Sequence, residues 1–142
     1  MRRIIGIGNR LVADDAIGPR VLDALARRDL PPDVDLVEGG LAGLDLLASF
    51  PGCERIVLVD AVSGFGAPGE AVTLAADEAA VASDGRYDHA AGLDYLLSAW
   101  SRLVGDGGPE VRVLGVETPA TDDDLEAAAS RALSLVVGDG GA

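Results

Sequence analysis

One nearly continuous apolar run, residues 55–60 (RIVLVD), constrains the fold of this chain more than any other feature. Its apolar residues do not alternate with polar ones, which is typical of a strand covered on both faces of a sheet. Further strand-like runs lie at 4–8, 34–37 and 111–116. We therefore expect a sheet with 55–60 at its centre.

Helical patterns separate these runs. Apolar residues spaced i, i+3, i+4 and i+7 indicate helices, and proline or glycine residues mark most of their ends. Arg27 and Arg28 are expected in the last turn of the first helix, where cations suit the helix dipole. The predicted helices run from about Ile17 to before Pro31-Pro32, over 44–50, over 89–104, and from a cap at Thr121 onward with Leu125, Ala129, Ala132, Leu133 and Val136 facing the core.

Residues 71–74 form a further apolar strand, after a glycine-rich connection that starts at Asp60. This connection is too short for a crossover helix, so the strand is expected to run antiparallel to 55–60. The chain is thus predicted to be an α/β protein, a three-layer sandwich with a five-stranded, mostly parallel sheet, one antiparallel strand and helices on both faces. Without a repeat or an internal boundary, residues 1–142 form a single predicted domain.

The charge composition excludes several classes of partner and reaction. With 24 acidic and 11 basic side chains, the net charge of −13 would repel nucleic acid and anionic membrane surfaces. Every basic residue is an arginine, so Schiff-base catalysis and a phosphate-loop lysine are excluded. A single cysteine excludes an intramolecular disulfide, and no stretch resembles a signal core or a membrane span. We therefore expect a cytoplasmic protein.

The order of the elements predicts where a ligand would bind. Right-handed crossovers on opposite faces place the first strand between the second and the third. The chain then leaves the first strand in one direction and the third strand in the other. The crevice beyond the carboxyl ends of these two strands is the usual ligand position in open α/β sheets. Asp14 and Asp15 follow the first strand, and Asp60 ends the third, so all three are expected at this crevice.

A dinucleotide could in principle bind at this crevice. Residues 6–8 (GIG) lie between a strand and a helix, as in the dinucleotide fingerprint, but Leu11 stands where the third glycine belongs. Asp14 and Asp15 would also repel a pyrophosphate at the start of the helix. Tight packing between strand and helix explains the glycines without a nucleotide.

The crevice could instead hold a catalytic nucleophile or a metal ion. Ser63 and Cys53 have no supporting motif, because no local pattern pairs either with His89, the single histidine. Asp15, Asp60 and His89 would give two carboxylates and one imidazole, which suit a first-row divalent cation and leave positions open for a substrate. Simpler roles stay open, since Asp15 could cap the first helix and His89 could be a hydrogen-bonded core residue. Asp60 ends a buried strand in a chain that has no lysine to pair with it.

Five motifs follow one another along the chain: residues 6–18 (GIGNRLVADDAIG), 38–43 (EGGLAG), 59–61 (VDA), 89–93 (HAAGL) and 114–117 (LGVE). Taken in this order, they resemble the family of hydrogenase maturation endopeptidases, which process the large subunit of NiFe hydrogenases. The family fold is a five-stranded α/β sandwich, in agreement with the architecture predicted above.

This resemblance implies a nickel-dependent processing endopeptidase. The acidic residue after the Gly-Asn loop, the aspartate of the third strand and the histidine before the long helix form the family's metal set, and they fall on Asp15, Asp60 and His89. The enzyme would recognise Ni²⁺ carried by the hydrogenase large-subunit precursor and then remove the C-terminal extension of that precursor. Other divalent metals would occupy the site in vitro. Asp15 or Asp60 would activate the attacking water, or the metal would.

Three further residues are predicted to bind the substrate at the same edge. Gly39 and Gly40 would accommodate the backbone of the partner, although a turn with positive φ would also explain them. Asn9 would orient its loop, although a left-handed turn residue is the simpler role. Two other functions stay open. One is a non-proteolytic, metal-binding maturation chaperone that forms a complex without cutting, and the other is a small-molecule metallohydrolase that needs no protein partner.

Overall fold

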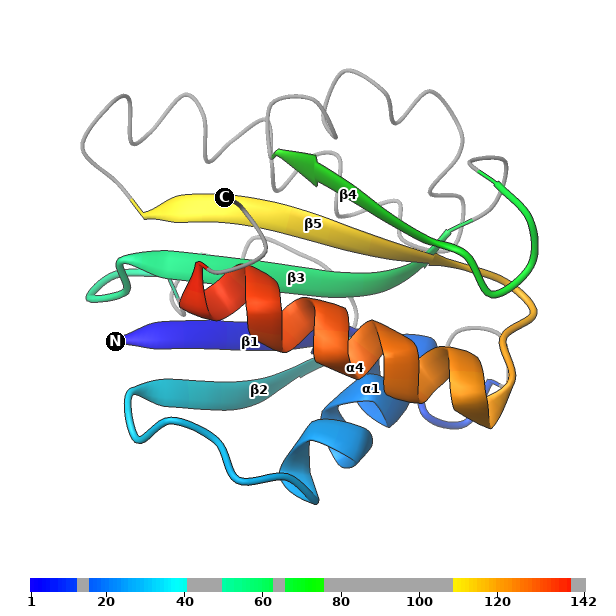
Figure 1. Ribbon diagram of the computed structural model, residues 1–142, viewed down its shortest axis with the longest axis horizontal. Coiled ribbons are helices and arrows are strands. Elements are labelled where there is room, and N and C mark those ends of the chain that lie inside the picture. The colour runs from blue at the N-terminus through cyan, green and yellow to red at the C-terminus, as the bar shows by residue number, and fades with distance from the viewer. Residues whose placement is uncertain (13–15, 41–49, 63–65, 76–108, 139–142) are drawn as a thin grey trace.

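The five strands form one mixed sheet in the order β2-β1-β3-β5-β4, which confirms the predicted α/β architecture (Figure 1). The computed structural model describes residues 1–12, 16–40, 50–62, 66–75 and 109–138. Strands β2, β1, β3 and β5 are parallel, and β4 is antiparallel to β5. The strands are β1 (Arg2–Ile7), β2 (Val34–Gly40), β3 (Arg55–Val62), β4 (Ala71–Ala75) and β5 (Glu110–Glu117).

The antiparallel strand has the predicted direction, and its hydrogen-bonded neighbour is β5. Strand β5 lies between β3 and β4, because its apolar residues are suited to a position that is covered on both faces. The short strand β4 takes the edge, where Ala71 is exposed and Val72 is half-buried. A bond of 2.8 Å from the Gly69 amide to the Glu117 carbonyl, and one of 2.9 Å from the Glu117 amide to the Glu70 carbonyl, extend this pair beyond β4.

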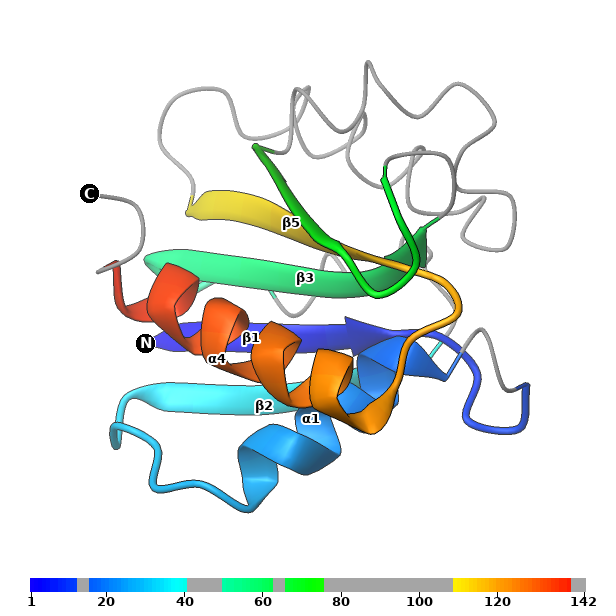
Figure 2. The same cartoon turned by 45° about the vertical axis from the view of Figure 1, so that its right-hand side comes forward.

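Two described helices, α1 (Ile17–Ala26) and α4 (Asp122–Val137), cover the same face of the sheet (Figures 1 and 2). Neither is both long and apolar enough to cross a lipid bilayer. The helices predicted at 44–50 and 89–104 lie outside the described residues, apart from Phe50 in a bend, so the predicted second helical layer stays a prediction. Between the sheet and the two helices lies a core whose members include Ile4, Val57, Val59, Leu114, Leu25, Leu125, Ala129 and Val136.

Helix α1 lies directly on the sheet because two glycines face each other. A Cβ atom on Gly6 would lie 2.6 Å from the carbonyl oxygen of Gly18 and 2.9 Å from Cδ1 of Leu22. A Cβ atom on Gly18 would lie 2.7 Å from the carbonyl oxygen of Val59 and still closer to the backbone of Ile7. Real Cβ atoms do not approach backbone this closely, so the contact requires glycine at both positions. This confirms the packing explanation for Gly6 of the GIG motif, whereas Gly8 has a positive φ of 137°.

The two helices begin and end differently. Thr121 caps α4 as predicted, because its Oγ1 accepts from the Asp124 amide at 3.1 Å while the Asp124 carboxylate accepts from the Thr121 amide at 2.9 Å. The N-cap of α1 is Ala16, which makes no side-chain cap bond, and Asp15, the alternative cap, lies outside the described residues. Helix α1 ends at Ala26, which places Arg27 just beyond it and not in its last turn.

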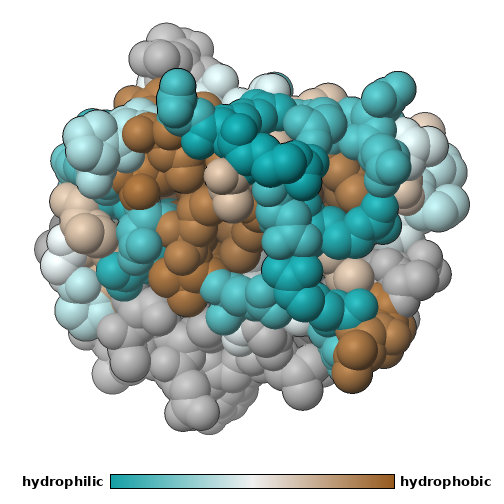
Figure 3. All heavy atoms as spheres, turned by 90° about the horizontal axis from the view of Figure 1, so that it is seen from below, coloured by the Kyte–Doolittle hydropathy of each residue, from teal (hydrophilic) through white to brown (hydrophobic). Residues whose placement is uncertain are grey.

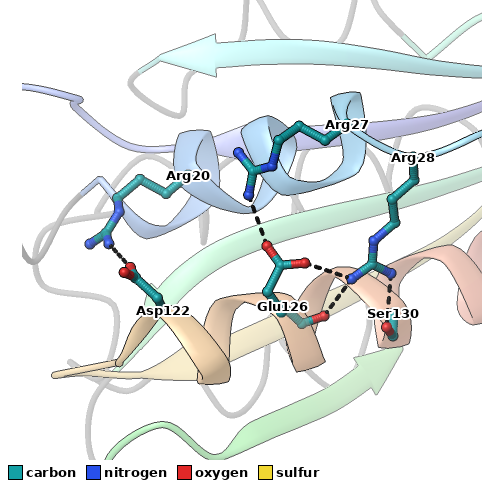
Figure 4. Close-up of polar contacts among 6 residues, drawn as sticks. All are labelled: Arg20, Arg27, Arg28, Asp122, Glu126 and Ser130. Carbon is teal, nitrogen blue, oxygen red and sulfur yellow. Dashed lines mark hydrogen bonds and ion pairs between the residues drawn. The ribbon is translucent and has the colours of Figure 1, made fainter.

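Ion pairs join α1 to α4 along their exposed sides (Figure 4). Arg20 lies 2.7 Å from Asp122, and Glu126 accepts from Arg27 at 2.8 Å and from Arg28 at 3.0 Å. The guanidinium of Arg28, followed by that of Arg27, lowers the pKa of Glu126. Seen from below, the molecule carries a band of hydrophilic side chains beside hydrophobic surface (Figure 3).

Candidate functional site

The carboxyl ends of the parallel strands meet at one edge of the sheet, on the right in Figure 1. Strand β1 has β2 on one side and β3 on the other, as the sequence predicted. The chain passes from β1 to β2 in one direction and from β3 towards β5 in the other, so the order switches at this edge. Ligands of open α/β sheets bind at such a switch point. The edge is therefore the candidate site.

Asp60 is the predicted site residue that the structure places at this edge. It belongs to the last part of β3, opposite Gly115 of β5, and its side chain is completely buried. Its Oδ1 atom accepts a hydrogen bond of 2.9 Å from the amide of Ala61. Val59 and Ala61 pack into the core beneath α1 and α4, so by strand alternation Asp60 points to the opposite face of the sheet.

The other two predicted metal ligands, Asp15 and His89, lie outside the described residues. The proposed convergence of Asp15, Asp60 and His89 therefore stays a prediction. Within the described ranges there is no group of three or more His, Cys, Asp and Glu side chains that could hold a metal ion. Asp60 thus needs ligands from other parts of the chain, or from a partner, to form such a site.

The loop after β1 is held in place by Asn9 and Arg10. The Oδ1 atom of Asn9 accepts from the Leu11 amide at 2.9 Å, and its carbonyl accepts from the Val12 amide at 3.1 Å. Among the described residues only glycines have positive φ, so the left-handed turn role for Asn9 is wrong and its amide side chain orders the loop. Whether Asn9 binds substrate stays a prediction.

Arg10 fastens this loop to two neighbouring elements. Its guanidinium donates to Glu38, near the end of β2, at 2.8 and 3.0 Å, and to both carboxylate oxygens of Asp23, in α1, at 2.8 Å. The bidentate bond from Arg10 lowers the pKa of Asp23, and the same contacts raise the pKa of Arg10. The sequence reasoning did not single out Arg10, because its two partners are distant in the chain.

Gly39 and Gly40 lie within β2 and not in a loop after it, which corrects their predicted setting. Gly6 pairs with Glu38 and Ile7 pairs with Gly40, so Gly39 is the extra residue of a β-bulge. Neither glycine has the positive φ that a turn would require. A bulge suits glycine because it lacks the side chain that would otherwise have to be placed on one face of the sheet. Their predicted contact with the substrate is untested.

Glu117 is a buried acidic residue at the same edge that was not predicted as part of the site. It ends β5 beside Val62, and 5 % of its surface is exposed. Its neighbour Val116 belongs to the core under α1 and α4, so Glu117 points to the same face as Asp60. The available signal was an acidic residue at the end of an apolar strand, which is the signal that identified Asp60.

Cys53 lies at the other end of the sheet, just before β3 begins, and it is buried. Asp60 lies near the carboxyl end of the same strand. The structure therefore disfavours Cys53 as a nucleophile at the candidate site, whereas Ser63 lies outside the described residues.

A cleft between α1 and α4 is lined by charged side chains that already form ion pairs. Arg20 pairs with Asp122, and Arg27 pairs with Glu126.

Comparisons with known proteins agree on one family. Residues 19–138 match the family model described as "Hydrogenase maturation protease". The chain is 35 % identical over 116 residues to hydrogenase 2 maturation protease of Escherichia coli, covering 80 % of this chain and 70 % of that protein. Its identity to the hydrogenase expression/formation protein HupD of Rhodobacter capsulatus is 38 % over 76 residues, covering 53 % of this chain and 36 % of that protein.

Solved structures resemble the whole chain. The hydrogenase-maturating endopeptidase HybD from E. coli superposes with a TM-score of 0.78 at 30 % identity, covering 99 % of this chain and 94 % of that chain. The NiFe hydrogenase maturation protease HybD from Thermococcus kodakarensis has a TM-score of 0.67 at 25 % identity, covering 97 % of this chain and 98 % of that chain. The likeness therefore extends over the sheet and over the edge that carries Asp60.

Proposed function

Because the chain belongs to the hydrogenase maturation protease family and is a peptidase, we propose that it removes the C-terminal extension of a NiFe hydrogenase large-subunit precursor after nickel has been inserted. The observation that supports this most directly is the position of Asp60. A carboxylate that is fully buried at the switch point of the sheet lowers the stability of the fold. Proteins typically keep such a buried charge where a functional site uses it. The lone cysteine is consistent with work in the reducing cytoplasm.

Nickel recognition is assigned to Asp15, Asp60 and His89. Two carboxylate oxygens and one imidazole nitrogen suit a borderline divalent cation, and they leave coordination positions for ligands that the substrate supplies. A set with so few ligands binds free metal weakly, but it can bind a metal that a partner already holds. The nickel of the precursor then marks which substrate is ready to be cut, and cleavage becomes a checkpoint for metal insertion.

The hydrolytic step is assigned to a water that a carboxylate activates. Asp60 or Asp15 would accept a proton from this water as it attacks the scissile carbonyl, in the manner of an aspartic-type endopeptidase. A general base must lie within hydrogen-bond reach of that proton, so it has to be at the edge where the substrate lies. The position of Asp60 near the carboxyl end of β3, at this edge, supports its assignment as the base. Gly39, Gly40 and Asn9 would contact the backbone of the substrate beside it.

Cleavage of a nickel-loaded precursor tests this function. The purified chain is mixed with the full-length precursor, with and without nickel, and the precursor mass is followed over time. We expect loss of the extension only in the presence of nickel, and a fall in rate of about 100-fold or more for Asp60→Asn. Asp35→Asn is the matched control, since Asp35 is a strand aspartate at the opposite end of the sheet and pairs with Arg3.

Three results would contradict the proposal. A precursor that forms a complex but keeps its full mass would indicate a maturation chaperone. Equal cleavage of the nickel-free precursor would remove the checkpoint. An Asp60→Asn variant that cuts at the wild-type rate would exclude Asp60 from the hydrolytic step, whether or not cleavage depends on nickel.

A further inference from the structure

Two aliphatic side chains are presented to solvent beside the candidate site. Leu11 is 93 % exposed and Val12 is 51 % exposed. Apart from Met1 at the other end of β1, they are the large hydrophobic residues that the described part of the chain leaves exposed. Leu11 hides almost none of its surface from water and Val12 hides only about half, so the folded chain alone gains little stability from burying them.

Hydrogen bonds within the loop order the backbone that carries these two side chains. Leu11 follows Arg10, whose guanidinium makes bonds of 2.8–3.0 Å to Asp23 and Glu38 from two different elements. The Asn9 side chain and carbonyl accept from the amides of Leu11 and Val12. An apolar contact that is already ordered loses less conformational entropy when a partner covers it. The arrangement is therefore suited to binding.

The position of the loop identifies the partner. Residues 8–12 continue directly from the carboxyl end of β1, the strand beside Asp60 in β3, and this loop lies on the right in Figure 1. A compact hydrophobic patch lies at the right-hand edge of the view from below (Figure 3). The loop and Asp60 therefore lie at the same edge of the sheet, where a polypeptide that reaches Asp60 would bind. The positive charge of Arg10 is more than offset by the carboxylates of Asp23 and Glu38, so the apolar tip carries no uncompensated positive charge beside it.

We propose that Leu11 and Val12 form a docking contact that inserts into an apolar pocket on the folded body of the protein substrate, next to the segment that is cut. This inference rests on the proposed function, because it takes the substrate to be a folded protein precursor. The proposal separates two tasks. The buried carboxylate at the edge of the sheet takes part in cleavage, and the apolar loop tip helps to bind the folded body of the substrate.

Kinetics on the full-length, nickel-loaded precursor test this contact. For the Leu11→Ala/Val12→Ala double variant we expect KM to rise about tenfold or more with kcat within twofold of wild type, as for loss of an apolar anchor. Arg10→Gln should raise KM by about threefold, because the loop tip loses its fastening, and Arg10→Lys should recover only part of that. Leu133→Ala is the matched control, a half-buried leucine on α4 whose truncation should leave KM unchanged.

Binding measured without cleavage separates this inference from the proposed function. In an Asp60→Asn background, the Kd for the precursor should rise by the same factor in the double variant. If the wild-type protein does not cut the precursor but the double variant still binds it more weakly, the proposed endopeptidase function is contradicted and the docking contact is supported. A Kd and KM within twofold of wild type would overturn the contact. So would a wild-type dimer that the double variant converts to a monomer, since the two side chains would then contact a second copy of the chain.

Discussion

The two ends of the sheet treat the same chemical group in opposite ways. At the end where the parallel strands begin, carboxylates are 43–61 % exposed and pair with arginines. At the end where these strands finish, Asp60 is fully buried and Glu117 is 5 % exposed. Exposed pairs cost the fold little, whereas each buried carboxylate must be compensated inside the protein. The fold carries that cost at the end that holds the candidate site.

The arginine-paired end shows how the chain manages its excess of acidic residues. Glu110, at the start of β5, accepts from Arg55 and Arg112 at 3.1 Å each. Arg2 lies 3.3 Å from Asp33 and 3.4 Å from Glu54. These contacts join the starts of neighbouring strands, so they help to fix the strand order without placing a charge in the core. The comparison between the two ends yields four predictions.

The largest effect is expected where α1 meets the carboxyl half of the sheet. Gly18→Ala places a Cβ atom against the backbone of β1 and β3, so it should lower the free energy of unfolding by about 3 kcal/mol or more. Chemical denaturation measures this. Ala127→Leu, which adds bulk at an exposed position of α4, should change stability by less than about 0.5 kcal/mol. Equal stability of the two variants would mean that α1 has room to move away from the sheet.

Removing the buried charge should cost function but not stability. Asp60→Asn should leave the free energy of unfolding unchanged or raise it by about 1 kcal/mol, because functional sites retain groups that the fold would gain from losing. Asp35→Asn breaks a pair of 3.0 Å with Arg3 and should lower it by up to about 1 kcal/mol. Thermal unfolding of both variants tests the difference. A loss of more than about 2 kcal/mol for Asp60→Asn would make this residue structural.

The pH dependence of stability should reveal the arginine-paired end. Burial opposes ionisation of Glu110, but bonds from Arg112 and Arg55 outweigh it and lower its pKa below the usual 4.5. A lowered pKa in the folded state adds stability above pH 4.5, which is lost as the pH falls through the folded value. Glu110→Gln should therefore flatten the fall in stability below about pH 4.5, by less than about 1 kcal/mol for so exposed a group. Identical acid-unfolding curves would refute the shift.

The smallest effect belongs to the pair between the two helices that is most open to solvent. Asp122 in the pair with Arg20 is 91 % exposed, so Arg20→Gln should cost less than about 0.5 kcal/mol, and salt should remove even that. Arg28→Gln loses bonds to the carboxylate and the carbonyl of Glu126 and to Ser130, and should cost more. Denaturant midpoints at low and high salt rank the two. The reverse order would show that exposure does not control the strength of these pairs.

Most of the sheet was predictable because its strands are apolar and flanked by glycine or proline. The strand starts at Val34, Arg55 and Ala71 agree with those predicted, and the order around β1 follows from the handedness of crossovers. The neighbour of β4 was not predictable in this way. The short connection fixed the direction of β4 but carried no information that β5 would enter between it and β3.

The sequence predicted where the site lies better than it predicted the side-chain contacts there. Asp60 was identified because a carboxylate at the end of a buried strand needs a compensating partner. The same argument applied to Glu117 would have found a second buried acid. The bulge at Gly39 was missed because a glycine pair indicates a turn and a bulge equally well. The fastening by Arg10 depends on side chains 13 and 28 residues away, which no local pattern connects.

The insertion of β5 between β3 and β4 affects how the chain is assembled during synthesis. A ribosome makes β4 well before the strand that pairs with it, so β4 must wait without its partner while residues up to Glu117 emerge. Pairing between strands that are adjacent in sequence cannot complete this sheet, and closure depends on one late, long-range step. Until that step, the apolar flank of β3 is open to other chains, so we expect nascent or truncated forms to aggregate more readily than the complete fold.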